Sequence, residues 1–299
     1  MRCIIFILLL SVVSVSFGQK TDKKLQKEIE SLIKDFHGDI GVYVHDLKHN
    51  SIAAVNADTI FPTASIVKIS ILTGIMQKIE TGQLGYHQRL TYTDSLFYDE
   101  GDDILSSFKS GATIELSKVM MLMLTISDNC ASLWLQGLSG GGTRINQILD
   151  SLGFKATRVN SRTPGREANR GIYGWGQTTP YEMATFMERI VNGTILSKTS
   201  SEKMLRLLGR QYWDEEALSQ IPPGIFAADK NGAVDESRNE ILYVNSKANP
   251  YIFSIFTKNN TDTSWNYNNE AWVLTRKLSA MLWKYYNPKS NWEALPVSK

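Results

Sequence analysis

A serine and a lysine three residues apart, Ser65 and Lys68, stand at the head of an apolar stretch of the sequence. Side chains at positions i and i+3 share one face of a helix, so these two groups can touch. A lysine buried beside a hydroxyl group can lose its charge and act as a base. The pair therefore predicts a serine nucleophile that requires no histidine.

The context of this pair separates it from three others with the same spacing. The stretch from Ile66 to Ile79 is apolar on nearly every helix face, which indicates a helix buried in the centre of a domain. A lysine inside such a helix needs a reason, because burying a charge is costly. The other pairs lie on an amphipathic helix or in polar stretches: Ser31 with Lys34, Ser106 with Lys109, and Ser200 with Lys203.

The composition is that of an ordinary globular protein. The chain has 299 residues, of which 42% are hydrophobic and 21% are charged, and its net charge is +2. This length suffices for a large core. The near-neutral charge and the lack of a basic run indicate no nucleic-acid partner. We expect a monomer that acts on a small-molecule substrate.

The first 18 residues have the pattern of a secretory signal peptide. Arg2 supplies the positive charge, an apolar core follows, and small residues precede Gln19. The apolar run is too short for a stable membrane anchor. We therefore expect a protein exported across the inner membrane to the periplasm. The remaining chain has one cysteine, Cys130, which excludes an internal disulfide and a thiolate zinc site.

Hydrophobic periodicity predicts two groups of strands separated by a long helical block. The strands are expected at 39–47 and 51–56, then at 225–228, 240–245 and 251–257. Helices are expected at 23–36, from 66 to about 81, and at 113–135, 144–152, 179–191, 200–208 and 272–286. This order predicts an α/β (α+β) sandwich, in which terminal helices flank a five-stranded antiparallel sheet. Residues 19–299 would form one domain, with an α/β part (19–62 and 220–299) and an inserted all-helical subdomain (63–219).

Two further motifs carry polar groups that can serve a site. Ser127-Asp128-Asn129 lies inside the helical block, and its Ser and Asn can enter one cleft if the helix ends or bends there. The alternative is an ordinary polar helix end. Lys230-Asn231-Gly232 offers a fixed positive charge and a glycine that allows a ligand to approach the backbone. A competing match, Lys109-Ser110-Gly111, precedes the Ser-Asp-Asn stretch.

Ser-x-x-Lys, Ser-Asp-Asn and Lys-x-Gly, in this order, resemble the motifs of the serine β-lactamases and penicillin-binding proteins. The spacing and the element order are similar to those of class A β-lactamases, as are Gln177-Thr178-Thr179-Pro180 and Gly111-Ala112-Thr113-Ile114. The resemblance spans most of the mature chain. It implies a β-lactamase/transpeptidase-like fold, no cofactor and no metal.

The resemblance implies roles for five residues in acylation. Ser65 would be the nucleophile, and Lys68 would be its base or relay protons to one. Ser127 would pass a proton to the leaving nitrogen, and Asn129 would bind the amide of the acyl side chain. The backbone N–H groups of Ser65 and Ala233 would hold the oxyanion.

The resemblance also implies residues that bind the substrate. Lys230 and Arg238 would hold a substrate carboxylate, with Gly232 beside it. Arg238 could instead pair with Glu236 or Glu240. Asn231 stands where the family usually has Thr or Ser.

Glu167 is the acid in the irregular stretch 154–178 that could drive deacylation. In the family this acid usually precedes an Asn by four positions, whereas Asn169 follows Glu167 by two. Glu167 could equally pair with Arg166 or Arg170 at the surface. This difference in the spacing of Glu167 and Asn169 affects the prediction of deacylation, and so of turnover, more than the prediction of acylation.

Three rival chemistries are weaker. Gly137-Leu138-Ser139-Gly140-Gly141 matches a hydrolase elbow, but every histidine precedes Ser139, so we interpret it as a helix–helix turn. His45 and His49 lie across a predicted hairpin turn and are expected to be solvated. Cys130 has no following histidine to activate it and is expected to be a buried helix residue.

We therefore predict a β-lactamase-type hydrolase that opens β-lactam amides through acyl-Ser65. The alternatives are a D-alanyl-D-alanine peptidase, or another serine hydrolase that penicillin acylates but that deacylates slowly, and a penicillin-binding sensor domain. The intact Ser65, Lys68 and Lys230 argue against an inactive site.

Overall fold

The computed structural model describes residues 19–98 and 103–298. The predicted signal peptide, residues 1–18, lies outside the described residues. Within the described part of the chain, no helix has the length and apolar character needed to cross a membrane.

The central sheet has six strands in the order β1-β3-β2-β11-β10-β9. Its strands are β1 (Lys20–Thr21), β2 (Asp39–Asp46), β3 (Ser51–Val55), β9 (Ala227–Val234), β10 (Ser237–Val244) and β11 (Tyr251–Lys258). The five predicted antiparallel strands are present. The sixth, β1, corrects the strand count: it pairs with β3 in parallel, because Asn50 and Ile52 accept backbone hydrogen bonds from Lys20 and Asp22.

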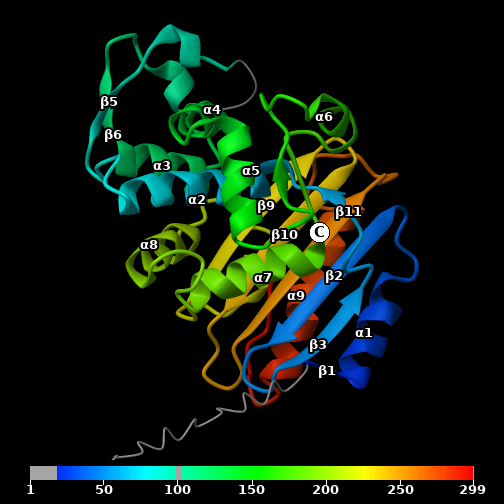
Figure 1. The fold of residues 1–299 in the computed structure, drawn as a ribbon. Helices are drawn as coiled ribbons and strands as arrows, with labels where there is room; N and C mark the ends of the chain where they lie inside the picture. Colours follow the sequence, from blue (N-terminus) through cyan, green and yellow to red (C-terminus); the bar gives the residue numbers. More distant parts are fainter. Residues whose placement is uncertain (1–18, 99–102, 299) are drawn as a thin grey trace, which may run out of the picture.

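Helices cover both faces of this sheet (Figure 1). The terminal helices α1 (Lys23–Ile33) and α9 (Glu270–Tyr286) pack on one face, over an apolar core that includes Leu25, Phe253 and Leu278. Helix α7 (Pro180–Val191) crosses the other face, where a second core continues into the helical block. The strands β10 and β11 are buried along almost their whole length, which explains the apolar run of β11 and of the second half of β10, residues 241–244; the first half of β10 buries polar side chains.

The helical block lies to one side of the sheet (Figure 1). Its helices are α2 (Val67–Glu80), α3 (Leu116–Thr125), α4 (Asn129–Leu138), α5 (Gly141–Ser151), α6 (Glu167–Tyr173) and α8 (Lys198–Leu208). Two small sheets join its loops: β4 (Phe61–Pro62), β7 (Arg158–Val159) and β8 (Gly176–Thr178) form one, and β5 (Arg89–Thr91) and β6 (Thr113–Glu115) form the other. Helix α2 is buried from Val67 to Met76, as its apolar sequence predicts.

The structure differs from the predicted elements at three places that shape the site. The predicted helix 113–135 is divided after Thr125, because Ser127 has a left-handed φ of 64° and Asp128 caps the start of α4. The stretch 154–178 contains α6 and two short strands instead of irregular chain alone. The Lys230-Asn231-Gly232 motif lies inside β9 and does not follow the strand.

Candidate active site

Ser65 lies on a short 3₁₀ turn, Ala64–Ile66, that leads directly into α2. Ala64 has a left-handed φ of 45°, which a non-glycine residue seldom adopts. The turn places Ser65 half-buried at the head of the helix, with its side chain lining two cavities. This is the position in which backbone N–H groups lack helical partners and can serve an oxyanion.

The Lys68 side chain is fully buried and connects all the groups expected to act in acylation. Its Nζ lies 2.9 Å from Ser65 Oγ, 2.9 Å from Ser127 Oγ, 2.5 Å from the Ser127 carbonyl oxygen and 2.8 Å from Asn129 Oδ1. Burial holds the pKa of Lys68 well below its usual range, and the charge of Lys230 lowers it further. Asp103 and Asp128 act in the opposite direction but do not restore the usual pKa.

The hydrogen-bond partners of Lys68 suit a neutral amine. The Ser127 carbonyl and Asn129 Oδ1 are acceptors and can take the two N–H groups of that amine. The lone pair then remains for a hydroxyl proton, and Ser65 Oγ is within reach at 2.9 Å. The arrangement can therefore deprotonate Ser65 without a histidine.

Two buried aspartates hold the Ser127-Asp128-Asn129 turn in place. The carboxylate of Asp128 accepts hydrogen bonds from the backbone N–H groups of Ala131 (2.7 Å) and Leu105 (3.0 Å). Asp103 Oδ1 accepts from the Asn129 N–H at 2.7 Å. The break between α3 and α4 thus turns both Ser127 and Asn129 toward Lys68, as the motif predicts.

Strand β9 runs beside Ser65 and brings the Lys-x-Gly motif to it. A side chain at Gly232 would place its Cβ 2.6 Å from the Thr63 carbonyl oxygen and 2.8 Å from the Ser65 nitrogen. Only glycine permits this approach. Lys230 is fully buried and donates to the Asn231 carbonyl oxygen at 2.9 Å. Burial lowers the pKa of Lys230 to about 8.

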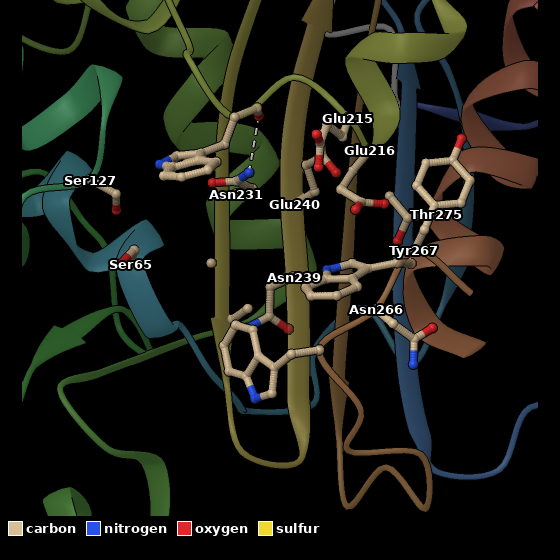
Figure 2. A pocket seen from close by; sticks show the side chains of 15 residues that line it. Ser65, Ser127, Glu215, Glu216, Asn231, Asn239, Glu240, Asn266, Tyr267 and Thr275 are labelled. Carbon is tan, nitrogen blue, oxygen red and sulfur yellow. Dashed lines mark hydrogen bonds between the residues drawn. The ribbon is translucent and has the colours of Figure 1, made fainter. Parts of the chain in front are cut away.

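Asn231 links strand β9 to the neighbouring loop. Its Oδ1 lies 3.2 Å from Lys230 Nζ, and its Nδ2 donates to the Trp213 carbonyl oxygen at 3.2 Å (Figure 2). An amide can make both contacts because it carries an acceptor and a donor.

Two cavities meet at Ser65. One, of about 520 Å³, starts at Ser65 and Ser127 and extends along β9 and β10 to α9; we call it the strand arm. The other, of about 560 Å³, is bounded by Asn129 and by Tyr98, Tyr173 and Trp175; we call it the loop arm. A substrate can therefore place one part on each side of the bond that Ser65 attacks.

Comparison with known proteins identifies the family. Residues 24–286 match the model of the beta-lactamase enzyme family. The chain belongs to this family. Beta-lactamase VEB-1 of Pseudomonas aeruginosa is 22% identical over 95% of this chain and 97% of its own length. Beta-lactamase BRO-1 of Moraxella catarrhalis is 26% identical over 66% of this chain and 63% of its own.

Solved structures share the fold of this chain. PBP-A has a TM-score of 0.80 at 24% identity, with 91% of this chain and 98% of that one covered. A class A β-lactamase from Mycobacterium abscessus has a TM-score of 0.76 at 22% identity, covering 88% and 99%. The predicted resemblance, the fold class and the enzyme class, a serine hydrolase of β-lactamase type, are confirmed.

Arg238, expected to hold a substrate carboxylate, does not line the site around Ser65. Its guanidinium donates to four carbonyl oxygens, those of Asp235, Ser237, Thr263 and Ser264, at 2.8–3.2 Å. It also stacks on Trp265, 4.3 Å from the ring centroid. The side chain is fully buried and lines neither cavity. It is not paired with Glu236 or Glu240 either, so its contacts are those of a residue that anchors a loop.

Glu167 also lies away from Ser65. It is exposed at the first turn of α6, and its Oε1 accepts from the Gly165 N–H at 3.1 Å. It lines neither arm of the site. Arg166 binds Asn160 and Gln177, so it does not pair with Glu167 as the alternative supposed. The loop presents Tyr173 and Trp175 to the cavity instead.

The residues considered for alternative chemistry, Ser139, Cys130 and His45, have structural contacts. Ser139 is buried between α4 and α5 and donates to the carbonyl oxygens of Leu135 and Gln136, as expected of a helix–helix turn. Burial raises the pKa of Cys130 to about 11, which disfavours a thiolate nucleophile. His45 was expected to be solvated, and this is wrong: it is buried, and its Nδ1 lies 3.1 Å from Glu188 Oε2.

Sequence reasoning missed several residues of the site. Asp103 lies in a polar loop with no motif around it, and Glu216 and Glu240, which line the strand arm, also belong to no motif. Among the described residues, one group, Asp103, Asp128 and Cys130, has ligand atoms close enough together for a metal ion. Both carboxylates already bind backbone N–H groups there, so we assign no metal to it.

Proposed function

We propose that the protein opens β-lactam amides by acyl transfer to Ser65. The observation that carries this proposal is the buried Lys68 amine, in contact with both Ser65 Oγ and Ser127 Oγ. Lys68 takes the proton of Ser65, and Ser65 Oγ attacks the lactam carbonyl carbon. The C–N bond then breaks, Ser127 delivers its proton to the departing nitrogen, and Lys68, 2.9 Å away, returns to Ser127 the proton that it took from Ser65.

The surrounding groups support this sequence of steps. The close approach of Gly232 to the Ser65 backbone leaves room for an oxyanion between the N–H groups of Ser65 and Ala233. Asn129, bound to Lys68 at the mouth of the loop arm, can hold an acyl side-chain amide there. We also propose, from residues 1–18, that the protein is exported to the periplasm.

A second candidate is an acyl-accepting hydrolase or penicillin-binding protein with slow turnover. The position of Glu167 favours it, because no carboxylate of the described loop faces Ser65 and an acyl ester needs a base to activate water. A solved structure of a PBP-A mutant, described as an acyl-enzyme complex with penicillin G, covers 91% of this chain with a TM-score of 0.79 at 25% identity. Lys68 is then the base nearest to the ester.

Hydrolysis of a chromogenic cephalosporin by the purified mature chain tests the proposal. We expect covalent labelling in one fast phase, and its loss in Ser65→Ala but not in Ser139→Ala. Continued turnover after the first equivalent supports the β-lactamase function, whereas a lasting adduct supports the second candidate. If Ser65→Ala labels as well as the parent, acyl transfer to Ser65 is excluded.

A further inference from the structure

When Lys68 takes the proton of Ser65, it becomes an ammonium in a buried position. The side chain is fully buried, and its Nζ contacts uncharged oxygen atoms, those of Ser65, Ser127 and Asn129. The charge of Lys230 is positive and opposes the ammonium. Because a buried charge is costly without an opposite charge close to it, this step requires a negative group.

Glu167 does not supply that negative group, because it is exposed at the start of α6 and lines neither arm of the site. Two other acids, Asp103 and Asp128, favour the charged form of Lys68, and the influence of Asp103 is the larger. Both acids are buried, so water and salt screen their charges weakly. The compensating charge therefore lies on the side of the site that carries the Ser-Asp-Asn motif.

The two buried carboxylates are bound in different ways. Both oxygens of Asp128 accept backbone N–H groups, from Ala131 at 2.7 Å and from Leu105 at 3.0 Å, and the side chain caps the start of α4. Asp103 Oδ1 accepts from the Asn129 N–H at 2.7 Å, whereas its Oδ2 has no hydrogen-bond partner among the described residues. Asp103 therefore keeps more of its charge for a neighbouring cation.

Asp103 is also connected to Lys68 through a single residue, Asn129. The backbone N–H of Asn129 donates to Asp103, and its side-chain Oδ1 lies 2.8 Å from Lys68 Nζ. Asp103 comes from the chain between β5 and β6, whereas Asn129 begins α4 and Lys68 lies in α2. The Asp103 carboxylate thus fixes a residue that contacts the amine, in addition to acting on it by charge.

We propose that Asp103 is a positioning residue for acylation, which holds Asn129 against Lys68 and supplies the buried negative charge that balances the Lys68 ammonium. This rests on acyl transfer to Ser65. In that transfer the Ser65 proton passes to Lys68 while the bond from Oγ to the carbonyl carbon forms. When the C–N bond breaks, Ser127 gives its proton to the nitrogen and receives one from Lys68. Asp103 takes no proton; it lowers the free energy of the step in which Lys68 is charged.

Two substitutions separate the charge of Asp103 from its hydrogen bond. Asp103→Asn removes the charge, and its amide oxygen can still accept the Asn129 N–H. Asp103→Ala removes both. Asp94→Asn is the matched control, because Asp94 is an exposed acid that also lies between β5 and β6. Each mature variant is labelled with a fluorescent penicillin, and the second-order rate of labelling is measured as a function of pH.

We expect two opposite changes in Asp103→Asn. Loss of the negative charge disfavours the ammonium, so the maximal rate should fall by about three- to tenfold. The same loss keeps Lys68 neutral at lower pH, so on the acid limb the rate relative to its maximum should be at least about threefold higher than in the parent. Asp94→Asn should show neither change. Damage to the fold lowers the rate at every pH and does not produce the second change.

The groups that face Lys68 and Asp103 are Lys230 from β9, Asp128 before α4 and the Cys130 thiol in α4. Burial raises the pKa of Cys130 to about 11 and lowers that of Lys230 to about 8, so neither titrates on the acid limb. Burial also raises the pKa of Asp103. The rates of the parent and Asp103→Asn should therefore approach each other at the lowest pH, where the Asp103 carboxyl group is protonated.

The hydrogen bond to Asn129 is tested with two penicillins. Penicillin G carries the acyl side-chain amide that Asn129 can hold, and 6-aminopenicillanic acid lacks it. Intact-mass measurements give the ratio of the two acylation rates. This ratio should be the same in the parent and Asp103→Asn, and it should fall at least about threefold in Asp103→Ala. An unchanged ratio in Asp103→Ala would contradict the positioning of Asn129.

The results for the charge have distinct meanings. If Asp103→Asn keeps the parental pH profile, or loses the same factor at every pH, the inference is overturned while acyl transfer to Ser65 stands. If Asp103→Asn does not fold, Asp103→Ser, which also removes the charge, replaces it in the same measurement. If the parent is not labelled, or Ser65→Ala is labelled equally, the proposed function fails and the inference fails with it.

Discussion

The two sides of Ser65 are built differently. On one side, Lys68, Ser127 and Asn129 are held in mutual contact by buried helix ends and by the carboxylates of Asp103 and Asp128. On the other, the loop of residues 154–178 turns its acid, Glu167, to solvent. Under the proposed function, this contrast predicts that acylation is preorganised, whereas deacylation depends on what the loop presents.

The largest effect is expected from Lys68→Ala. Removal of the base that contacts Ser65 Oγ should lower the rate of acylation by about 10²–10⁴-fold. Stopped-flow measurement with a chromogenic cephalosporin gives that rate. The matched controls Lys34→Ala, Lys109→Ala and Lys203→Ala should keep it, and a comparable loss in any of them would contradict the assignment of the base.

The pH dependence of acylation offers an independent test of the same group. The active form of Lys68 is the neutral amine, so acylation should fall as the pH drops through its pKa. Burial and Lys230 hold that pKa well below the usual lysine range. The rate of acylation is measured as a function of pH. If acylation occurs only at the alkaline pH at which an ordinary lysine loses its proton, the pKa of Lys68 is not lowered and Lys68 is not the base.

Ser127→Ala should lower acylation by an intermediate amount, about 10–10³-fold, because it removes the hydroxyl that protonates the leaving nitrogen. Ser70→Ala is the matched control: Ser70 is buried on the same helix as Lys68, and its hydroxyl has no hydrogen-bond partner among the described residues. The two rates are compared with one cephalosporin. Equal losses would point to disturbance of the helix and not to proton transfer.

Arg238→Ala should mainly affect stability. Loss of the four carbonyl contacts should cost at least ~2 kcal/mol, which lowers Tm by roughly 4–8 °C. Arg206→Ala, at an exposed ion pair with Glu202, should have little effect. Calorimetry gives both values. If Arg238→Ala left Tm unchanged and lowered activity only on carboxylate-bearing substrates, Arg238 would be a substrate-binding residue and this prediction would be wrong.

These expectations show which parts of the molecule can be predicted from sequence. The five main strands and the Ser65–Lys68 pair were predictable, because burial leaves apolar patterns and a lysine inside such a pattern stands out. Arg238 was misjudged because the loop that supplies its carbonyl partners, near Thr263 and Ser264, has no periodic signal. The burial of His45 was missed because it depends on Glu188, far away in the sequence.

The acids of the strand arm were unpredictable for the same reason. Glu216 belongs to a loop, and Glu240 was considered only as a partner for Arg238. Their meeting beside Thr275 follows from the packing of α9 against β10, which brings together residues from three separate segments. Functional residues that lie close together at one helix end can be predicted from the sequence. Functional residues that come from distant loops cannot, because only the tertiary fold brings them together.

The smallest effect, and the most direct test of the contrast between the two sides of Ser65, is expected from Glu167→Gln. Time-resolved mass spectrometry of the penicillin adduct measures formation and loss separately in the parent and the variant. Because Glu167 is exposed and lines neither arm, both rates should agree with the parent within about twofold. An adduct that forms at the parental rate but then persists only in Glu167→Gln would contradict this account and make Glu167 the deacylating base.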